Sequence, residues 1–165
     1  MSHQPLLIAL ALPTLAWATA VAQVPSAAAR TQVRFAGPAG MQVRWLVRGP
    51  DGQVGYSEPP LEAPARYNFR QGATYPLKLS GIPGFPGLEL YPTLEVPLVG
   101  PAAQQFLAHS AVQLALTDED FRRATAGELV VKTVHLPGAG GVVAPLLVLR
   151  LGNRDLEVPG TPGKD

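Results

Sequence analysis

The sequence contains no cysteine, and this absence excludes several kinds of chemistry at once. Disulfide bonds, zinc–thiolate sites, iron–sulfur clusters and thiol nucleophiles all require that residue. The folded part of the chain must therefore be held together by its hydrophobic core. A chain of 165 residues is long enough to bury such a core.

Charge is also scarce, and no run of basic residues occurs. Charged residues make up 15% of the chain and the formal net charge is +1. Nucleic-acid binding needs a clustered footprint of Lys and Arg side chains. The sequence therefore predicts a protein that binds no nucleic acid.

Catalytic motifs are missing as well. No HExxH, HxH or G-x-S-x-G pattern is present, and Gly138–Gly141 lacks the Lys-Ser/Thr of a phosphate-binding loop. Glu89 and Glu95 would lie about 20 Å apart on one strand, too far for a glycosidase pair. We therefore expect no enzyme, no cofactor and no catalytic residue.

Glycine and proline, in contrast, make up more than a fifth of the chain, which favours many short elements joined by turns. We predict a mainly β fold, an antiparallel β-sandwich with two short inserted helices; a two-layer α+β arrangement is the alternative. The helices are expected from Gly100-Pro101 to His109 and from Thr117 to Gly127. The strands are expected at Thr31–Phe35, Met41–Arg48, Gln53–Ser57, Arg66–Phe69, Thr74–Ser80, Leu88–Val96, Ala111–Leu116, Glu128–Leu136 and Leu146–Leu151.

The stretch Ile82–Pro97 shows the clearest strand pattern. Apolar and polar residues alternate over Leu88–Val96, as in a strand with one buried face. The Pro/Gly-rich segment before it predicts a tight connection to an antiparallel strand at Tyr75–Ser80. Because Pro92 cannot donate a ladder hydrogen bond, we expect this strand to be a sheet edge or to be bulged there.

The polar side of that strand is the best candidate for an exposed binding face. Its residues are Glu89, Tyr91, Thr93 and Glu95. The alternative is that the two glutamates only keep an exposed edge strand soluble and unpaired.

Trp45 shares its strand parity with Met41 and Val43, so we expect it in the core and not as a ligand-stacking residue. Arg44 and Arg48 lie on the opposite side of the same strand. They could meet an anionic group, although solvated strand charges are the simpler explanation.

Three consecutive acidic residues invite a metal-site interpretation. Asp118, Glu119 and Asp120 would point about 100° apart on a helix and so do not converge. Stabilisation of a helix N-terminus, with Thr117 as its cap, explains them better.

Two further functions are kept as alternatives. A small metal-dependent enzyme could combine His109 and His135 with an acidic residue, although no ligand spacing supports it. A carbohydrate-binding β-sandwich could use Tyr91, Tyr75 or Tyr67, which is a weak signal because the three are scattered.

The N-terminus resembles an export signal. The apolar run Leu6–Ala20 ends in small residues, which predicts a signal peptide at 1–22 with cleavage after Ala20 or Ala22. An uncleaved membrane anchor is the alternative, and only then would the protein contact a membrane. We expect a linker at 23–30, a single β-rich domain at 31–157, a disordered tail at 158–165, and a periplasmic or extracellular location.

Three blocks of the sequence, IPGFPGLELYPTLEV, FLAHSAVQLALTDEDFRRATAGELVVKTVHLP and VLRLGNRDLEVPG, resemble an uncharacterised family of exported bacterial proteins. The resemblance covers roughly Val33 to Val158; this chain is shorter between Gly138 and Val142 than the family pattern. It implies export but no activity, cofactor or site residue. Together these observations predict a non-enzymatic, exported binding or structural module of the cell envelope, such as an accessory subunit with a protein partner.

Overall fold

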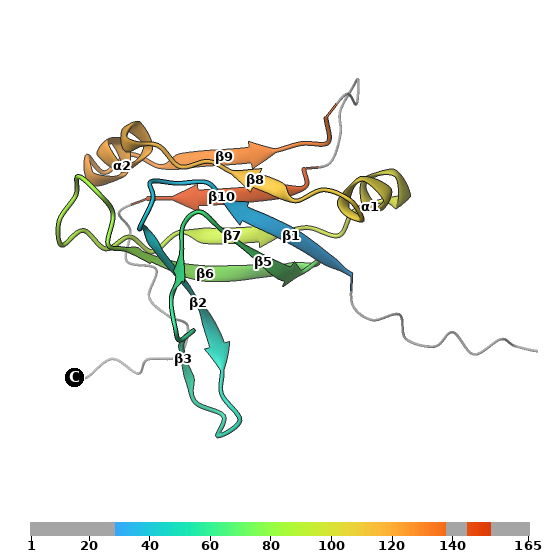
Figure 1. Ribbon diagram of the computed structural model, residues 1–165, viewed down its shortest axis with the longest axis horizontal. Coiled ribbons are helices and arrows are strands. Elements are labelled where there is room, and N and C mark those ends of the chain that lie inside the picture. The colour runs from blue at the N-terminus through green and yellow to red at the C-terminus, as the bar shows by residue number, and fades with distance from the viewer. Residues whose placement is uncertain (1–28, 138–144, 153–165) are drawn as a thin grey trace, which may run out of the picture.

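The computed structural model describes residues 29–137 and 145–152, and these form two β-sheets that face each other (Figure 1). The small sheet has the strand order β5–β1–β8. Its central strand pairs antiparallel with β5 and parallel with β8. Its strands are β1 (Arg30–Phe35), β5 (Ala65–Arg70) and β8 (Val112–Leu114).

The large sheet has seven strands in the order β3–β2–β6–β7–β10–β9, with β4 also pairing with β2, and all its pairs are antiparallel. Two short helices, α1 and α2, flank β8 along the chain. The mainly β sandwich predicted from the sequence is therefore confirmed. The bounds are β2 (Gln42–Arg48), β3 (Val54–Tyr56), β4 (Leu61–Glu62), β6 (Ala73–Ser80), β7 (Thr93–Val96), β9 (Val130–Val134), β10 (Leu147–Leu151), α1 (Pro101–Leu107) and α2 (Asp118–Thr125).

The core lies between the two sheets and is filled by every second residue of the strands. Phe69 of β5 is 1% exposed, and its ring contacts the rings of Phe35, Trp45, Tyr67 and Tyr75, with centroids 4.7–6.2 Å away. Trp45 is buried, as its parity predicted. Because successive strand residues point to opposite sides, the intervening residues form the two outer faces of the sandwich.

The strand after the Pro/Gly-rich turn differs from its prediction. The regular strand β7 is only Thr93–Val96, and it lies between β6 and β10, so it is not an edge. No bulge occurs at Pro92 either: Leu79 and Leu90 exchange backbone hydrogen bonds, in register with the β6–β7 pairs beyond the proline. The Pro92 carbonyl still accepts from the Leu77 N–H at 2.8 Å. Proline therefore removes one hydrogen bond here without shifting the register.

Both helices begin where the sequence predicted. Pro101 occupies the first turn of α1, which ends at Leu107, two residues earlier than expected. Thr117 caps α2 in a reciprocal capping box with Asp120, and Gly127 follows the helix with a φ of 86°.

The predicted signal peptide, the linker up to residue 28, the Gly138–Gly141 loop and the 158–165 tail lie outside the described residues. Among the described residues, no helix has the length and apolar character needed to cross a membrane.

Candidate functional site

The residues predicted as a binding face do share one side of the large sheet. The Glu89 carboxylate lies 2.8 Å from the Lys78 ammonium on the neighbouring strand. The Tyr91 hydroxyl donates to the same carboxylate at 2.8 Å, and Lys78 lies over the Tyr91 ring. The carboxylate of Glu89 therefore forms an ion pair with Lys78 and accepts a hydrogen bond from Tyr91.

Two further ion pairs accompany this cluster. The Glu95 carboxylate lies 2.8 Å from the Arg150 guanidinium on β10, and Arg44 on β2 lies 3.1 Å from Glu58. Thr93, directly opposite Arg150 in the β7–β10 pairing, is half-buried. Because Glu95 lies in β7, between β6 and β10, the explanation that it protects an exposed edge does not apply to it. Glu89 lies before β7, beside Leu90, which bridges to Leu79 of β6. We call this surface the paired face; its residues are Arg44, Glu58, Lys78, Glu89, Tyr91, Glu95 and Arg150.

The pKa shifts on the paired face follow from these contacts. Hydrogen bonding to Lys78 lowers the pKa of Glu89, and the bond to Glu89 raises the pKa of Lys78. The bond to the Glu89 carboxylate also raises the pKa of Tyr91, while burial raises that of Tyr56. These shifts favour an ionised carboxylate, a protonated amine and protonated phenols. The cluster therefore holds its charges in place and offers no group that exchanges protons near neutral pH.

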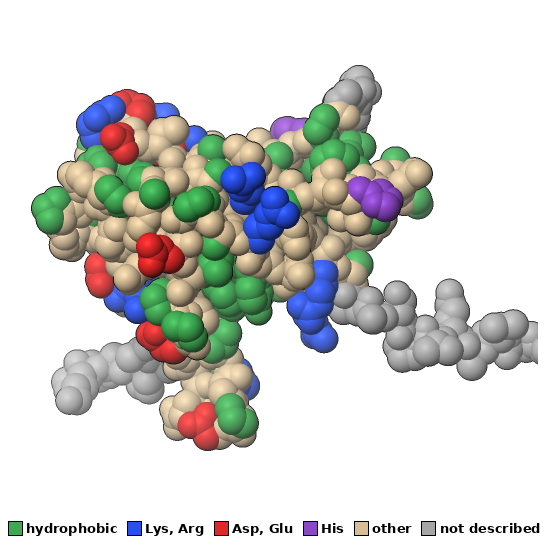
Figure 2. Space-filling model, in the orientation of Figure 1, with side chains coloured by type: hydrophobic (Ala, Val, Ile, Leu, Met, Phe, Trp, Pro, Cys, Tyr) green, Lys and Arg blue, Asp and Glu red, His purple; other side chains and the backbone are tan. Residues whose placement is uncertain are grey.

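The paired face also sets two cations directly opposite each other, Arg44 and Lys78, but each of them has a carboxylate partner. The outer side of the small sheet differs in this respect. Arg30 lies directly opposite Arg70, and Arg34 lies directly opposite Arg66 in the β1–β5 pairing. All four side chains are exposed, and none forms an ion pair within the described part of the chain. Figure 2 shows basic side chains over β1 and β5 with no acidic side chain among them. Like charges directly opposite each other destabilise a sheet.

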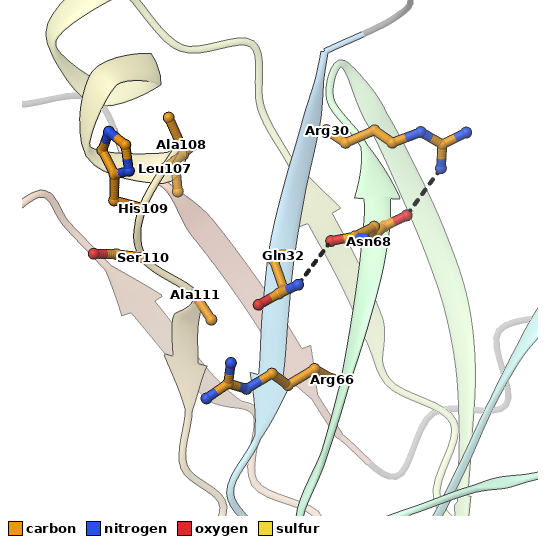
Figure 3. Close-up of a pocket in the computed structure, with 9 residues that line it drawn as sticks. All are labelled: Arg30, Gln32, Arg66, Asn68, Leu107, Ala108, His109, Ser110 and Ala111. Carbon is orange, nitrogen blue, oxygen red and sulfur yellow. Dashed lines mark hydrogen bonds between the residues drawn. The ribbon is translucent and has the colours of Figure 1, made fainter.

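Between the two arginine pairs lies a pair of amides. Gln32 is opposite Asn68, and its Nε2 donates to the Asn68 side-chain oxygen at 3.3 Å. One guanidinium, that of Arg30, reaches over β5 and donates to the Asn68 backbone carbonyl at 3.0 Å, whereas the Arg66 side chain extends over β1 toward β8 (Figure 3). We call this surface the arginine face; its residues are Arg30, Arg34, Arg66, Arg70, Gln32 and Asn68.

A shallow depression of about 320 Å³ lies beside the arginine face. Its far wall is the segment Leu107–Ala111, which places His109 and Ser110 across from Gln32 (Figure 3). The amide of Gln71, which is 8% exposed, fixes this wall. It accepts from Gln104 of α1 at 2.7 Å and donates to Thr31 of β1 at 3.1 Å.

The structure does not gather the candidate metal ligands. His109 borders the depression and His135 follows β9, and among the described residues no group of His, Asp and Glu is arranged to hold a metal ion. In the acidic triplet, Glu119 pairs with Arg122, while Asp120 turns inward to Lys132 and Thr117. The carboxylates diverge, as the helical geometry predicted.

The three candidate tyrosines do not form one sugar-binding platform. Tyr67 packs against Trp45 with ring centroids 4.1 Å apart, and Tyr75 packs on Phe69 at 4.7 Å. Tyr91 lies on the paired face, on the other side of the large sheet, with Tyr56 as its aromatic neighbour. A flat aromatic surface shared by these residues is therefore not present.

The arginine face was missed because no stretch of sequence is visibly basic. A signal was nevertheless present: Arg30–Arg34 reads RTQVR and Arg66–Arg70 reads RYNFR, so Arg-x-amide-x-Arg occurs twice. Since strand residues two apart share a side, each segment presents two arginines and one amide on one face. Only the pairing of β1 with β5 brings the two segments together.

The fold and its two outer faces define a β-sandwich with one surface of compensated charge and one of uncompensated positive charge. No family model, no curated protein and no solved structure matches this chain.

Proposed function

We propose that this protein is a non-enzymatic, exported binding module of the cell envelope that holds an anionic partner on the arginine face. The observation that carries the proposal is the two directly opposed arginine pairs, which have no carboxylate partner among the described residues. Export to the envelope is supported by the apolar Leu6–Ala20 run and by the family resemblance.

The energetic argument is a comparison between the free and the bound protein. Opposed like charges cost the free sheet a few tenths of a kcal/mol to about 1 kcal/mol per pair. An anion placed between two guanidinium groups removes that repulsion and adds charge-assisted hydrogen bonds. Arginine suits this role because its planar fork of donors matches carboxylate and phosphate groups.

The experiment measures binding of a simple synthetic polyanion, polyacrylate, by calorimetry at physiological salt. The variants Arg30→Gln/Arg70→Gln and Arg34→Gln/Arg66→Gln each remove one opposed pair. The matched control, Arg44→Gln/Arg150→Gln, removes two positive charges from the paired face. We expect about tenfold weaker binding for each arginine-face variant, since two contacts of up to about 1 kcal/mol are lost.

The control variant is expected to bind like the unaltered protein. Equal weakening by all three double variants would mean that only net charge matters, and would contradict a localised site. Weaker binding at higher salt, with a smaller salt dependence in the arginine-face variants, would support it.

A protein partner, also predicted from the sequence, has one observation in its favour. Among the described strands β9 ends the large sheet, and Leu129 and Val131 are 63% and 51% exposed there. An exposed apolar edge strand can pair with a strand of another protein. Val131→Lys should release a partner co-purified from native envelope under mild conditions, whereas recovery of the unaltered protein alone and monomeric would contradict this second role.

A further inference from the structure

The arginine face has a repeated, nearly symmetric layout. The register pairs Arg30 with Arg70, Gln32 with Asn68, and Arg34 with Arg66, so the two Arg-x-amide-x-Arg segments match when one is reversed. At about 3.3 Å per residue, the two arginine pairs are separated by roughly 13 Å along the strands. A ligand that fits this surface has anionic groups at two places and neutral polar groups between them.

The amide pair at the centre indicates what the neutral part is. Side-chain amides both donate and accept hydrogen bonds, as sugar hydroxyls do. The Gln32–Asn68 hydrogen bond is long, at 3.3 Å, so a ligand can replace it at little cost. The adjoining depression is bordered on its far side by the segment that contains His109 and Ser110.

Other polyanions fit this layout less well. Duplex DNA carries one charge per about 1.7 Å, which would put several phosphates over the neutral amides. Single strands bind by base stacking on aromatic rings, and the aromatic residues of β1 and β5, namely Phe35, Tyr67 and Phe69, point toward the interior side and pack on one another.

A membrane surface is also disfavoured. Peripheral binding to bilayers combines basic residues with apolar side chains that insert between the headgroups. The large hydrophobic residues that are exposed in the described part of the chain lie off the arginine face: Val47, Val54, Tyr67, Leu98, Leu129 and Val131. The arginine face itself offers only polar groups.

We propose that the ligand of the arginine face is a linear acidic polysaccharide whose carboxylates bind the two arginine pairs and whose hydroxyls bind Gln32 and Asn68. This inference rests on the proposed function and specifies its ligand. Carbohydrate would then be bound by the outer side of the small sheet, and not by the tyrosines that the sequence suggested.

The experiment compares four probes on the purified folded protein: oligogalacturonate, its methyl ester, vesicles of anionic lipid and a single-stranded oligonucleotide. The methyl ester has the same sugar chain without its charges. We expect oligogalacturonate to bind at least tenfold more tightly than the other three. Arg30→Gln/Arg70→Gln should weaken its binding about tenfold.

The decisive variant is Gln32→Ala/Asn68→Ala, which keeps every charge. It should weaken oligogalacturonate binding about fivefold, since direct hydrogen bonds to hydroxyls are lost, and should leave polyacrylate binding unchanged. A thermal unfolding curve like that of the unaltered protein shows that each variant is folded.

The outcomes separate the two proposals. Binding of polyacrylate or lipid vesicles without binding of oligogalacturonate overturns the polysaccharide inference and leaves anion binding intact. An unchanged oligogalacturonate affinity in the amide variant also overturns the inference. Failure of every anionic probe overturns both proposals.

Discussion

Both outer faces of the sandwich carry charged side chains, but the two faces arrange these charges differently. On the paired face, Lys78 meets Glu89 and Arg150 meets Glu95 across neighbouring strands. On the arginine face, arginine meets arginine in both opposed pairs. A net charge of +1 therefore conceals a strong asymmetry, because nearly all of the described carboxylates that form ion pairs lie on the large sheet or beside α2. The distribution of charge is thus more informative about function than its sum.

The largest effect on stability is expected from Asp120 of α2, the most buried carboxylate among the described ion pairs. Asp120 is 6% exposed, accepts from the Thr117 N–H at 2.8 Å and lies 2.6 Å from the Lys132 ammonium. Asp120→Ala should lower the free energy of unfolding by about 2 kcal/mol in urea denaturation, because it removes the Asp120 half of the capping box and the partner of Lys132. Its exposed neighbour gives the control, since Asp118→Ala should change stability by less than about 0.5 kcal/mol. Equal effects would show that this charge pairing does not support the fold.

Acid should produce a smaller loss at the same residue. Burial alone would raise the pKa of Asp120, but hydrogen bonds from Lys132 and Thr117 outweigh it and the pKa is lowered from 3.8. A carboxylate whose pKa is lower in the folded than in the unfolded chain stabilises the fold at pH values above its unfolded pKa. This contribution disappears as the pH falls through the folded pKa.

Urea denaturation at pH 6 and in steps below pH 4 measures this loss. Asp120→Asn should have a flatter profile than the unaltered protein over that range. The acid effect should be smaller than that of Asp120→Ala, since a protonated carboxyl still hydrogen-bonds with Thr117. Parallel profiles for the two proteins would assign the acid sensitivity to other groups.

Exchanging charges between the faces sharpens the comparison further. Arg34→Glu converts one like-charged pair with Arg66 into an opposite pair, and should stabilise the protein by about 0.5 kcal/mol. Glu95→Arg does the reverse beside Arg150 and should destabilise it by a similar amount. Thermal or urea unfolding of both variants measures the two signs. If Arg34→Glu destabilises the protein, the opposed arginines are not a cost to the free sheet.

The smallest effect is expected from deleting one exposed pair. Glu95 and Arg150 are each 40% or more exposed at the side chain, so water and salt already screen them. A double-mutant cycle of Glu95→Gln and Arg150→Gln should give a coupling free energy below about 0.5 kcal/mol. A coupling of more than about 1 kcal/mol would mean that the paired face stabilises the fold more than we infer.

Much of the fold could be predicted because its signals are local. The parity of Trp45, the hairpin turn at Gly49–Gly52 and the Thr117 cap each depend on a few neighbouring residues, and all three occur in the structure. The expectation for Pro92 was wrong because a missing N–H has a different effect where the carbonyl still has a partner across the ladder. Pro92 therefore indicates which backbone hydrogen bond is missing, but not whether its strand lies at the edge of the sheet.

The candidate surfaces were likewise predictable only in part. The alternation of Glu89, Tyr91, Thr93 and Glu95 is enough to predict that these residues share one outer side, because side-chain direction in a strand has a period of two. Their partners Lys78 and Arg150 could not be inferred with equal certainty, since those lie on other strands.

The sequence by itself determined the strands, the helix caps and which side chains share a side, because these depend on backbone geometry over a few residues. Only the tertiary structure decided that β1 pairs with β5, which lies about 35 residues further along the chain, in a register that sets Arg30 against Arg70 and Arg34 against Arg66. Strand pairing is selected by burial of the whole core, to which the outward arginines contribute little. The charge pattern of the outer face is consequently a product of the fold and cannot be read from either segment alone.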